Sequence, residues 1–492
     1  MVLFLCLLVL LAAAGHAMAA PDLRAVLRGS VAGAVAAAAG LGGLAAAVFG
    51  RGTVQTGGGA WSIDRFGALM LLLIAAVYLA TILGSHRYVA AEHQAGILST
   101  AKVRLYFALM PLFALAMVVT VTTDHLGVLW IALEATTLAT TPLVALYKKD
   151  GAIEAAWKYL LLCSVGISVS LLGLLLVAYA GAGAGLPVDA ALSLAALTAR
   201  AHDLDPEVMR WAFVFLFVGI GTKVGLVPMH PWLPDAHSRT PSPVSAALSG
   251  VLLNVALYGL LRTRALVDLA LGSGGWTSAF FWVFGLGSVL FAAFVLLHQQ
   301  NYKRMLAYHS VEHMGLIAFG LGLGPAGAAG AVMHMVGHTL AKSALFLSAG
   351  EILLHRHTTK IANIGGLWKT LPRTSLGFLL GFLGLIGAPT SIIFASELTF
   401  LMAAARQRPY SAVVLVVALA IVAVGVLHHV FAMLFGEGGR PVPPETPPEG
   451  WTLTHAVVAA ELALLFAGGL FFLTTPGFQL AASIAATFTP QP

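Results

Sequence analysis

Long apolar runs follow one another along nearly the whole chain, and short polar connections separate them. A helix that crosses a lipid bilayer requires about 20 mostly apolar residues. Runs of this kind cover residues 2–20, 26–49, 65–85, 103–122, 124–146, 155–180, 209–229, 241–262, 276–298, 305–323, 327–354, 373–404, 410–435 and 452–475. The pattern predicts an all-α polytopic membrane protein with about fourteen transmembrane helices.

The composition agrees with this class. Hydrophobic residues make up 59% of the chain and charged residues 9%, whereas an average soluble domain is about a quarter charged. A cytosolic enzyme, a disordered protein and a nucleic-acid binder are therefore excluded. Cys6 and Cys163 are the two cysteines, too few for an iron–sulfur cluster or a structural zinc site.

The distribution of basic residues predicts the topology. No basic residue precedes the first apolar run, and Arg24 follows it, which is the reverse of a secretory signal. We therefore expect an uncleaved first helix with its N-terminus outside, although Ala17-Met18-Ala19 leaves a cleaved signal as the alternative. With fourteen spans both termini lie outside, and the inner loops carry roughly twice as many Lys and Arg as the outer ones, as the positive-inside rule expects. We expect a multi-pass protein of the inner (cytoplasmic) membrane.

Two connections are long. Residues 181–208 have room for a short surface helix. The connection from Gly436 to Gly450 is rich in proline, which predicts an extended loop.

A few ionisable residues lie inside the apolar runs, where each charge costs about 2.5–3.5 kcal/mol on an insertion scale. Glu134 lies about ten residues into the fifth run. A buried carboxyl of this kind either carries protons or is satisfied by hydroxyls such as those of Thr136 and Thr137. We favour the first interpretation because buried, perturbed acids mark functional sites.

Lys223 ends the first part of the seventh run, and Pro228, Pro231 and Pro234 follow it. Prolines interrupt a helix, and a broken helix within a membrane lies inside protein or lines a watery cavity. Lysine beside such a break resembles the ion sites of transporters. The alternative is a lysine that extends its side chain to the membrane surface.

His334, His338 and Lys342 are spaced by four residues in the eleventh run, so they lie along one helical face. Two histidines at this spacing can bind zinc, but the face offers neither the glutamate of a zinc-protease motif nor a third ligand. We therefore predict no metal and no cofactor, and expect either a proton relay or hydrogen bonds between helices.

Glu397 lies about two helical turns after Gly387 and Pro389, which interrupt the twelfth run. Two broken helices in two halves of a chain indicate an internal repeat. The alternative for Glu397 is an acid at a frayed helix end.

The tenth run opens with three more ionisable residues, His309, Glu312 and His313. They are candidates for lining a proton access route from the inner face. The equal alternative is that they lie among the lipid headgroups. His428 and His429 in the thirteenth run are equally ambiguous.

Three segments resemble one known family. The run TKVGLVPMHPWLPDAHSRTPSPVSAALSGVLLNVALYGLLR resembles the signature stretch of the proton-conducting membrane subunits, and NYKRMLAYHSVEHMGLIAFG and MHMVGHTLAKSALFLSAGEI resemble its next two helices. That family contains the antiporter-like subunits of respiratory complex I, the membrane subunits of energy-converting hydrogenases and the multi-subunit cation/proton antiporters. The resemblance covers roughly residues 100–435. The string from Tyr308 to Met314 is most similar to the hydrogenase-4 F-type subunits.

The resemblance implies fourteen helices with two inverted five-helix repeats and with helices 7 and 12 broken. Three N-terminal helices then occupy residues 1–100, the first repeat 101–265, the second repeat 275–436, and helix 14 with the tail 451–492.

The resemblance also implies a proton relay. By motif, its members here are Glu134, Lys223, His334, His338, Lys342 and Glu397. Many relatives carry Lys or His where this chain has Asn254, so water or His230 would have to bridge that position.

The function implied is proton translocation within a redox-driven complex of the hydrogenase or NADH/quinone dehydrogenase type. The chain shows no nucleotide, flavin or cluster motif, so no catalytic centre of its own is expected, and the redox chemistry belongs to partner subunits and a soluble redox arm. A Na⁺ or K⁺/H⁺ antiporter without redox partners is the first alternative. A structural membrane subunit that only docks the redox arm is the second.

Overall fold

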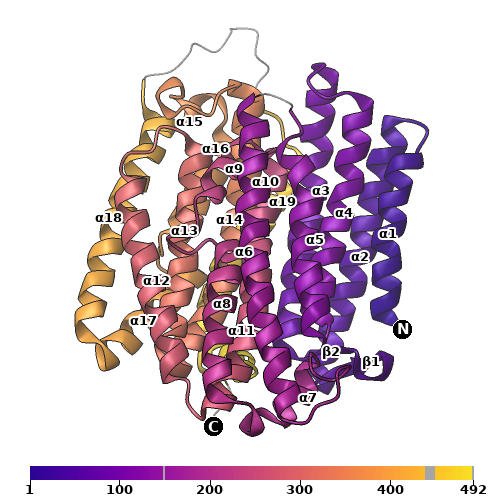
Figure 1. Ribbon diagram of the computed structural model, residues 1–492. Helices are drawn as coiled ribbons and strands as arrows, with labels where there is room; N and C mark the ends of the chain where they lie inside the picture. Colours follow the sequence, from indigo (N-terminus) through magenta and orange to yellow (C-terminus); the bar gives the residue numbers. More distant parts are fainter. Residues whose placement is uncertain (148–149, 438–448, 490–492) are drawn as a thin grey trace.

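The computed structural model describes residues 1–147, 150–437 and 449–489, and shows a bundle of helices with one small β-hairpin at its end (Figure 1). Each of the fourteen predicted spans coincides with one helix or with consecutive helical segments. The all-α polytopic fold is therefore confirmed.

The N-terminal part contains three long helices and the hairpin. Asp22 and Asp64 cap the second and third helices by accepting hydrogen bonds from the first-turn amides of Ala25 and Gly67, as capping side chains do. The elements are α1 (Val2–Ala19), α2 (Leu23–Arg51), β1 (Val54–Thr56), η1 (Gly57–Gly59), β2 (Trp61–Ile63, antiparallel to β1) and α3 (Arg65–Gln94).

The middle of the chain contains the first broken helix, α8 and α9, and a helix with one π-helical turn, α10–η3–α11. The short helix α7 lies in the connection 181–208, where a short helix was expected. The elements are α4 (Thr100–Thr122), α5 (Leu126–Val144), α6 (Asp150–Gly183), α7 (Leu194–Ala199), η2 (Ala201–Asp203), α8 (Pro206–Val224), α9 (Trp232–Arg239), α10 (Ser242–Ala247), η3 (Leu248–Leu252) and α11 (Leu253–Leu271).

The last part contains the second broken helix, α16 and α17. The elements are α12 (Gly275–Leu296), α13 (Tyr302–Leu321), α14 (Gly324–Arg356), η4 (Ile361–Asn363), α15 (Leu367–Thr370), α16 (Pro372–Leu385), α17 (Ile392–Gln407), α18 (Pro409–Phe435), α19 (Leu453–Phe472) and α20 (Thr475–Ala485). Lys148 and Lys149, and the prolines of the predicted extended loop between Gly436 and Gly450, lie outside the described residues.

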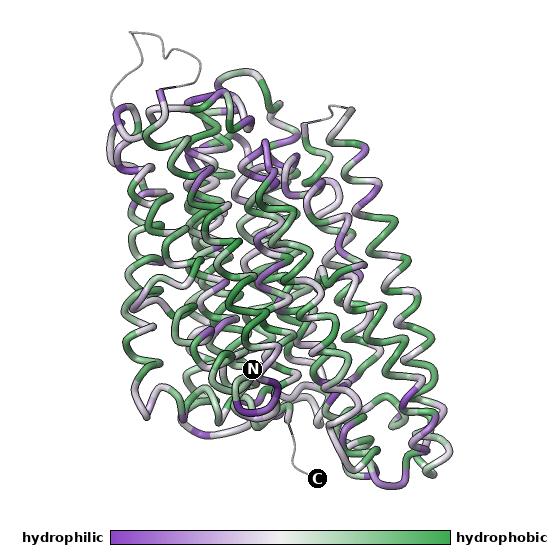
Figure 2. Tube along the Cα trace, turned by 90° about the vertical axis from the view of Figure 1, so that its left-hand side faces the viewer, coloured by the Kyte–Doolittle hydropathy of each residue, from purple (hydrophilic) through white to green (hydrophobic). Residues whose placement is uncertain are grey.

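Ten spans in the described part of the chain are long and apolar enough to cross a membrane by themselves. They are α1–α6, the α10–α11 segment, α12, α18 and α19. The four remaining predicted spans, α8–α9, α13, α14 and α16–α17, carry most of the candidate ionisable residues. In Figure 2 hydrophobic residues dominate the length of the bundle, and hydrophilic residues gather at both ends and recur within it.

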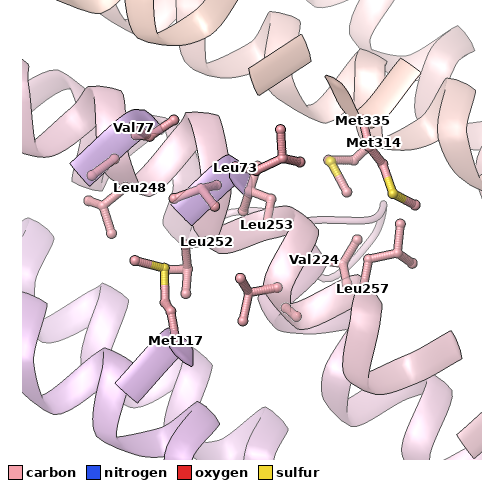
Figure 3. Packing of buried hydrophobic residues seen from close by; sticks show 14 of the residues in the cluster. Leu73, Val77, Met117, Val224, Leu248, Leu252, Leu253, Leu257, Met314 and Met335 are labelled. Atoms are coloured by element: carbon pink, nitrogen blue, oxygen red, sulfur yellow. The ribbon is translucent and has the colours of Figure 1, made fainter. Parts of the chain in front are cut away.

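The N-terminus and the last described residues, which follow α20, lie at the same end of the bundle as α7 and the hairpin, whereas α15 lies at the opposite end (Figure 1). An even number of spans requires this arrangement. The helix that contains α10 and α11 lies in the middle of the bundle and is buried along almost its whole length. Leu248 and Leu252 of this helix lie beside Leu73 and Val77 of α3 and Met117 of α4 (Figure 3).

Candidate functional site

The first helix break is built by backbone conformation and by side chains that satisfy the freed backbone groups. Gly225 ends α8 with a left-handed backbone, at φ 85°, which glycine adopts without strain. The Trp232 indole donates to the carbonyl of Thr222 over 2.7 Å, and the Ser288 hydroxyl accepts from the amide of Val227 over 3.0 Å. The break is therefore a stable feature that fixes the end of α8.

Lys223, in the last turn of α8, is fully buried. Its ammonium donates to the carbonyl of Leu133 and to the hydroxyl of Thr137, both on α5. The same Thr137 hydroxyl donates to Oε2 of Glu134 over 3.4 Å, and Ser164 of α6 donates to Oε1 over 2.5 Å. The predicted lysine–glutamate pair is thus bridged by one hydroxyl rather than joined directly. We name Glu134, Thr137 and Lys223 the first cluster.

A second cluster lies between α13, α14 and α17. Its members from α13 are His309, Glu312 and His313, all buried to within about 1% exposure. Nδ1 of His309 is 2.7 Å from Oε2 of Glu312, and Nε2 of His313 is 3.4 Å from the same oxygen. These residues therefore lie deep in the bundle and pack against the face of α14.

Three residues of α14, all fully buried, complete the second cluster. Nε2 of His334 is 2.7 Å from Nδ1 of His313, and the rings of His338 and His313 are 5.5 Å apart. The ammonium of Lys342 donates to the carbonyl of Leu306 over 2.6 Å and interacts electrostatically with Glu312. The three α14 residues predicted to share one helical face (the α14 stripe) and the three α13 residues (the α13 trio) thus form one site. We define the second cluster as His309, Glu312, His313, His334, His338 and Lys342.

Glu397 joins the second cluster from the second helix break. Nδ1 of His334 is 2.8 Å from the hydroxyl of Ser396, the neighbour of Glu397, and Glu397 interacts electrostatically with Glu312. Gly387 in the break has φ 74°, and a Cβ atom at this position would overlap Oε2 of Glu397. The glutamate therefore folds back over the break.

A cavity of about 630 Å³, lined in part by charged side chains, opens at the end of the bundle opposite α7 and the hairpin, the end predicted to face inward. Glu92 lines it and accepts hydrogen bonds from the Tyr147 hydroxyl over 2.8 and 3.0 Å. Lys303 of α13 also lines the cavity and donates to the carbonyl of Thr240. His237 of α9 is within electrostatic reach of Lys303 and Lys342. Lys303 thus lies at the cavity, and His237 lies within electrostatic reach both of Lys303 and of Lys342 in the second cluster.

His230 was expected, as the alternative to water, to bridge the position that Asn254 occupies. The ring of His230 lies 4.7 Å from that of Phe291, and Nδ1 of His230 has no hydrogen-bond partner in the described part of the chain. Asn254 donates to the hydroxyl of Thr339 over 3.0 Å and to the carbonyl of Met335 over 3.3 Å. Asn254 therefore ties α11 to α14.

Apolar side chains pack beside both clusters. Val224 follows Lys223 in the chain, whereas Met314 follows His313 and Met335 follows His334. Figure 3 shows these three residues close to Leu257. No hydrogen bond among the described residues joins Lys223 to the second cluster, so the two clusters are separate polar sites with an apolar layer beside them.

Sequence reasoning did not single out two residues that the structure places in or near the site, and it missed one contact of a third. His237 lies seven residues after His230 in the same proline-rich segment, and both of its ring nitrogens are buried without a partner in the described chain. Thr137 was considered only as a hydroxyl partner of Glu134, and its contact with Lys223 was not predicted. Glu461 is a buried acid on α19 beside Ser343, and the rule that selected Glu134 applies equally to it.

Comparison with known proteins identifies the family. Residues 123–422 match the family described as "NADH:quinone oxidoreductase/Mrp antiporter, TM". The chain belongs to this family. The matched region contains both clusters and both helix breaks.

Within the NADH:quinone oxidoreductase/Mrp antiporter family, the chain is 38% identical over 369 residues to a hydrogenase-4 component F homolog of Methylacidiphilum infernorum, covering 74% of this chain and 76% of the relative. It is 32% identical over 277 residues to NADH-quinone oxidoreductase subunit N of Desulforudis audaxviator, covering 56% of this chain and 54% of that relative. The alignment thus spans three quarters of the first relative and about half of the second.

Solved structures share the fold. A chain of the membrane-bound sulfane sulfur reductase, an archaeal respiratory membrane complex, superposes with a TM-score of 0.85 at 24% identity, over 100% of this chain and 99% of that chain. A chain of the Mrp complex from Dietzia sp. gives a TM-score of 0.83 at 20% identity, over 99% and 97%. The family fold therefore extends over the whole length of this chain.

Proposed function

We propose that this chain is the proton-translocating membrane subunit of a redox-driven complex of the hydrogenase or NADH/quinone dehydrogenase type. One observation carries the proposal: Lys223 and Lys342 are fully buried, and within the described residues both donate only to uncharged oxygens. A lysine held in this way exchanges its proton without breaking a direct ion pair. Each has a carboxyl nearby, in Glu134 and Glu312 respectively.

The proposed route runs from the inside along Glu134, Lys223, a hydrated segment near Asn254, Lys342 and Glu397 to the outside. The Thr137 hydroxyl contacts both Glu134 and Lys223. It therefore determines how strongly the charge on one of these residues affects the protonation of the other. The inner cavity, through Lys303 and His237, supplies a second point of proton uptake.

Water must enter the apolar layer for the two clusters to exchange protons, because proton transfer needs a continuous hydrogen-bonded chain. A change in the packing of Val224 against Met314 and Met335 would admit that water. We infer that partner subunits drive this change, and that the layer otherwise prevents protons from leaking back.

The energy must come from partners. Moving one charge against the membrane potential costs about 2.3 kcal/mol per 100 mV, and we assign no redox centre to this chain. The names of the relatives, a hydrogenase-4 component and an NADH-quinone oxidoreductase subunit, support assembly with other membrane subunits and with a soluble redox arm.

The proposed setting is the inner (cytoplasmic) membrane, with both termini outside. The two inverted repeats are assigned to residues 101–265 and 275–436. The broken helices α8–α9 and α16–α17 fall at corresponding places in these two ranges, which supports the assignment.

The decisive experiment replaces Lys223 by Ala in the assembled complex. Redox-driven proton uptake into inverted membrane vesicles should fall at least about a hundredfold, the lower end of what a positioned proton-transfer group contributes. Lys369→Ala, which removes an exposed lysine of α15, is the control and should leave proton uptake unchanged. Near-normal proton uptake by Lys223→Ala would disprove the assignment of Lys223 to the relay.

A Na⁺ or K⁺/H⁺ antiporter is the second candidate, supported by the family description, which names the Mrp antiporter. Addition of Na⁺ or K⁺ to proteoliposomes that contain this chain, without any redox substrate, would then dissipate a preformed pH gradient. Absence of this response, together with redox-driven proton uptake by the complex, favours the first candidate.

A further inference from the structure

Two histidines and a glutamate of α13 place ligand atoms together. Along α13, Glu312 lies three residues after His309 and His313 lies four residues after it. Side chains at these spacings from His309 lie on the same face of a helix. One ligand atom from each lies within 4.8 Å of the other two. Two imidazoles and one carboxylate form a ligand set that open zinc sites use.

The spacing of these atoms fits a zinc-sized ion. Ligands that surround zinc tetrahedrally at about 2.0–2.1 Å lie about 3.3 Å from one another. Nε2 of His313 is 3.4 Å from Oε2 of Glu312, which already matches, and Nδ1 of His309 is 2.7 Å from that oxygen. A small rotation of the His309 side chain would bring its distance from Glu312 to the same spacing, and the His338 ring, 5.5 Å from that of His313, would have to move toward the ion.

Unpartnered nitrogens around the trio point to a ligand. In the described chain, Nε2 of His309 and both ring nitrogens of the buried His338 have no hydrogen-bond partner, and Nε2 of His313 forms no hydrogen bond although it lies 3.4 Å from Oε2 of Glu312. Buried polar atoms are normally satisfied, and His338 is a fourth donor of the kind zinc prefers. Nδ1 of His313 contacts His334. Metal-binding histidines usually form such a hydrogen bond with the ring nitrogen that does not bind the metal, so Nε2 of His313 is left to bind the ion.

We propose that His309, Glu312 and His313, with His338 as the fourth donor, bind one divalent transition-metal ion of the zinc class. Magnesium and calcium prefer oxygen ligands, so they should not compete. A bound ion would occupy four members of the second cluster and, in a chain with the proposed function, would arrest proton transfer. Lys303 precedes His309 by six residues on α13, about 9 Å along the axis, so the inner cavity offers the ion its approach.

The test measures binding rather than transport. Zn²⁺ is titrated calorimetrically into chelator-treated purified protein, and Co²⁺ absorption reports the coordination geometry. The wild type should bind one ion with a tetrahedral Co²⁺ spectrum that excess Mg²⁺ leaves unchanged. His313→Gln should weaken Zn²⁺ binding at least a hundredfold, and His334→Gln about 10- to 100-fold, as outer-contact substitutions do.

A double variant of the partly exposed pair on α18, His428→Gln/His429→Gln, is the control and should bind Zn²⁺ like the wild type. Unchanged affinity in both His309→Gln and His313→Gln, or equal competition by Mg²⁺, would overturn the site. If His313→Gln does not elute as folded protein, Glu312→Gln and His309→Gln serve in its place. The inference does not depend on the proposed function, because Lys223→Ala should bind Zn²⁺ normally whatever its effect on proton uptake.

Discussion

Thr137 is the smallest group in the first cluster and the one on which its geometry depends. Its hydroxyl accepts from Lys223 and donates to Glu134, so the two ionisable side chains interact through one oxygen. A direct ion pair would hold the charges together, whereas a hydroxyl bridge lets small movements of α5 against α8 change their coupling.

Replacement of Thr137 by Val keeps the shape of the side chain but removes this bridge. A buried polar group that loses its partner costs about 1–3 kcal/mol, so proton uptake by the assembled complex should slow at least about fivefold. Thr137→Ser should restore most of the rate. Equal rates for wild type and Thr137→Val in vesicle assays would show that the bridge has no role.

Sequence reasoning selected most of the candidate residues because a charge within an apolar run is conspicuous. Glu134, Lys223, Lys342 and Glu397 were selected in this way. The joining of the α13 trio to the α14 stripe could not be predicted, because it depends on how the two helices rotate against each other. The assignment of all these residues to a proton relay stays a prediction.

At the scale of helices, both breaks were predictable because proline and glycine leave a clear signal. The π-helical turn of η3 was not, since nothing in Leu248–Leu252 marks it. Ser249 in this turn contacts Ser310 over 2.7 Å, and the carbonyl of Gly250 accepts from Thr339 over 2.7 Å. The turn therefore depends on tertiary contacts, and π turns are frequent at functional sites.

Gly387 gives the second break a testable role. Gly387→Ala places a Cβ atom against Glu397, and the left-handed backbone adds about 1–2 kcal/mol of strain. We expect a lower midpoint of thermal unfolding and slower proton uptake. The double variant Gly387→Ala/Glu397→Asp should recover part of the stability, because the shorter acid relieves the overlap.

Gly287→Ala is the matched control, since a Cβ atom at that position on α12 meets open space. Its unfolding midpoint should stay within about 1 °C of the wild type, given the small effect of unconstrained surface changes. A Gly387→Ala protein as stable and active as this control would contradict the proposed overlap.

At the scale of the whole molecule, the N-terminus and the last described residues share one end of the bundle, as fourteen spans require. Which end faces outward is a prediction from the excess of Lys and Arg in the loops predicted to face inward. The native cysteines, Cys6 and Cys163, are both buried, so introduced cysteines can be labelled selectively.

A cysteine at the exposed position Thr198 of α7 should react with a membrane-impermeant maleimide in right-side-out vesicles. A cysteine at the exposed position Lys369 of α15 should react only in inverted ones. The opposite pattern would reverse the topology and, with it, the direction assigned to the proton route.

The polarity of α13 and α14 has a further consequence during biosynthesis. Neither helix is among the spans apolar enough to cross a membrane by itself, so release of either one alone into lipid would expose buried histidines and lysine to hydrocarbon. Their apolar neighbour α12, made just before and packed against α13, would shield them. These helices should therefore leave the translocon as a group, and shortening α12 should cause misinsertion of everything that follows it.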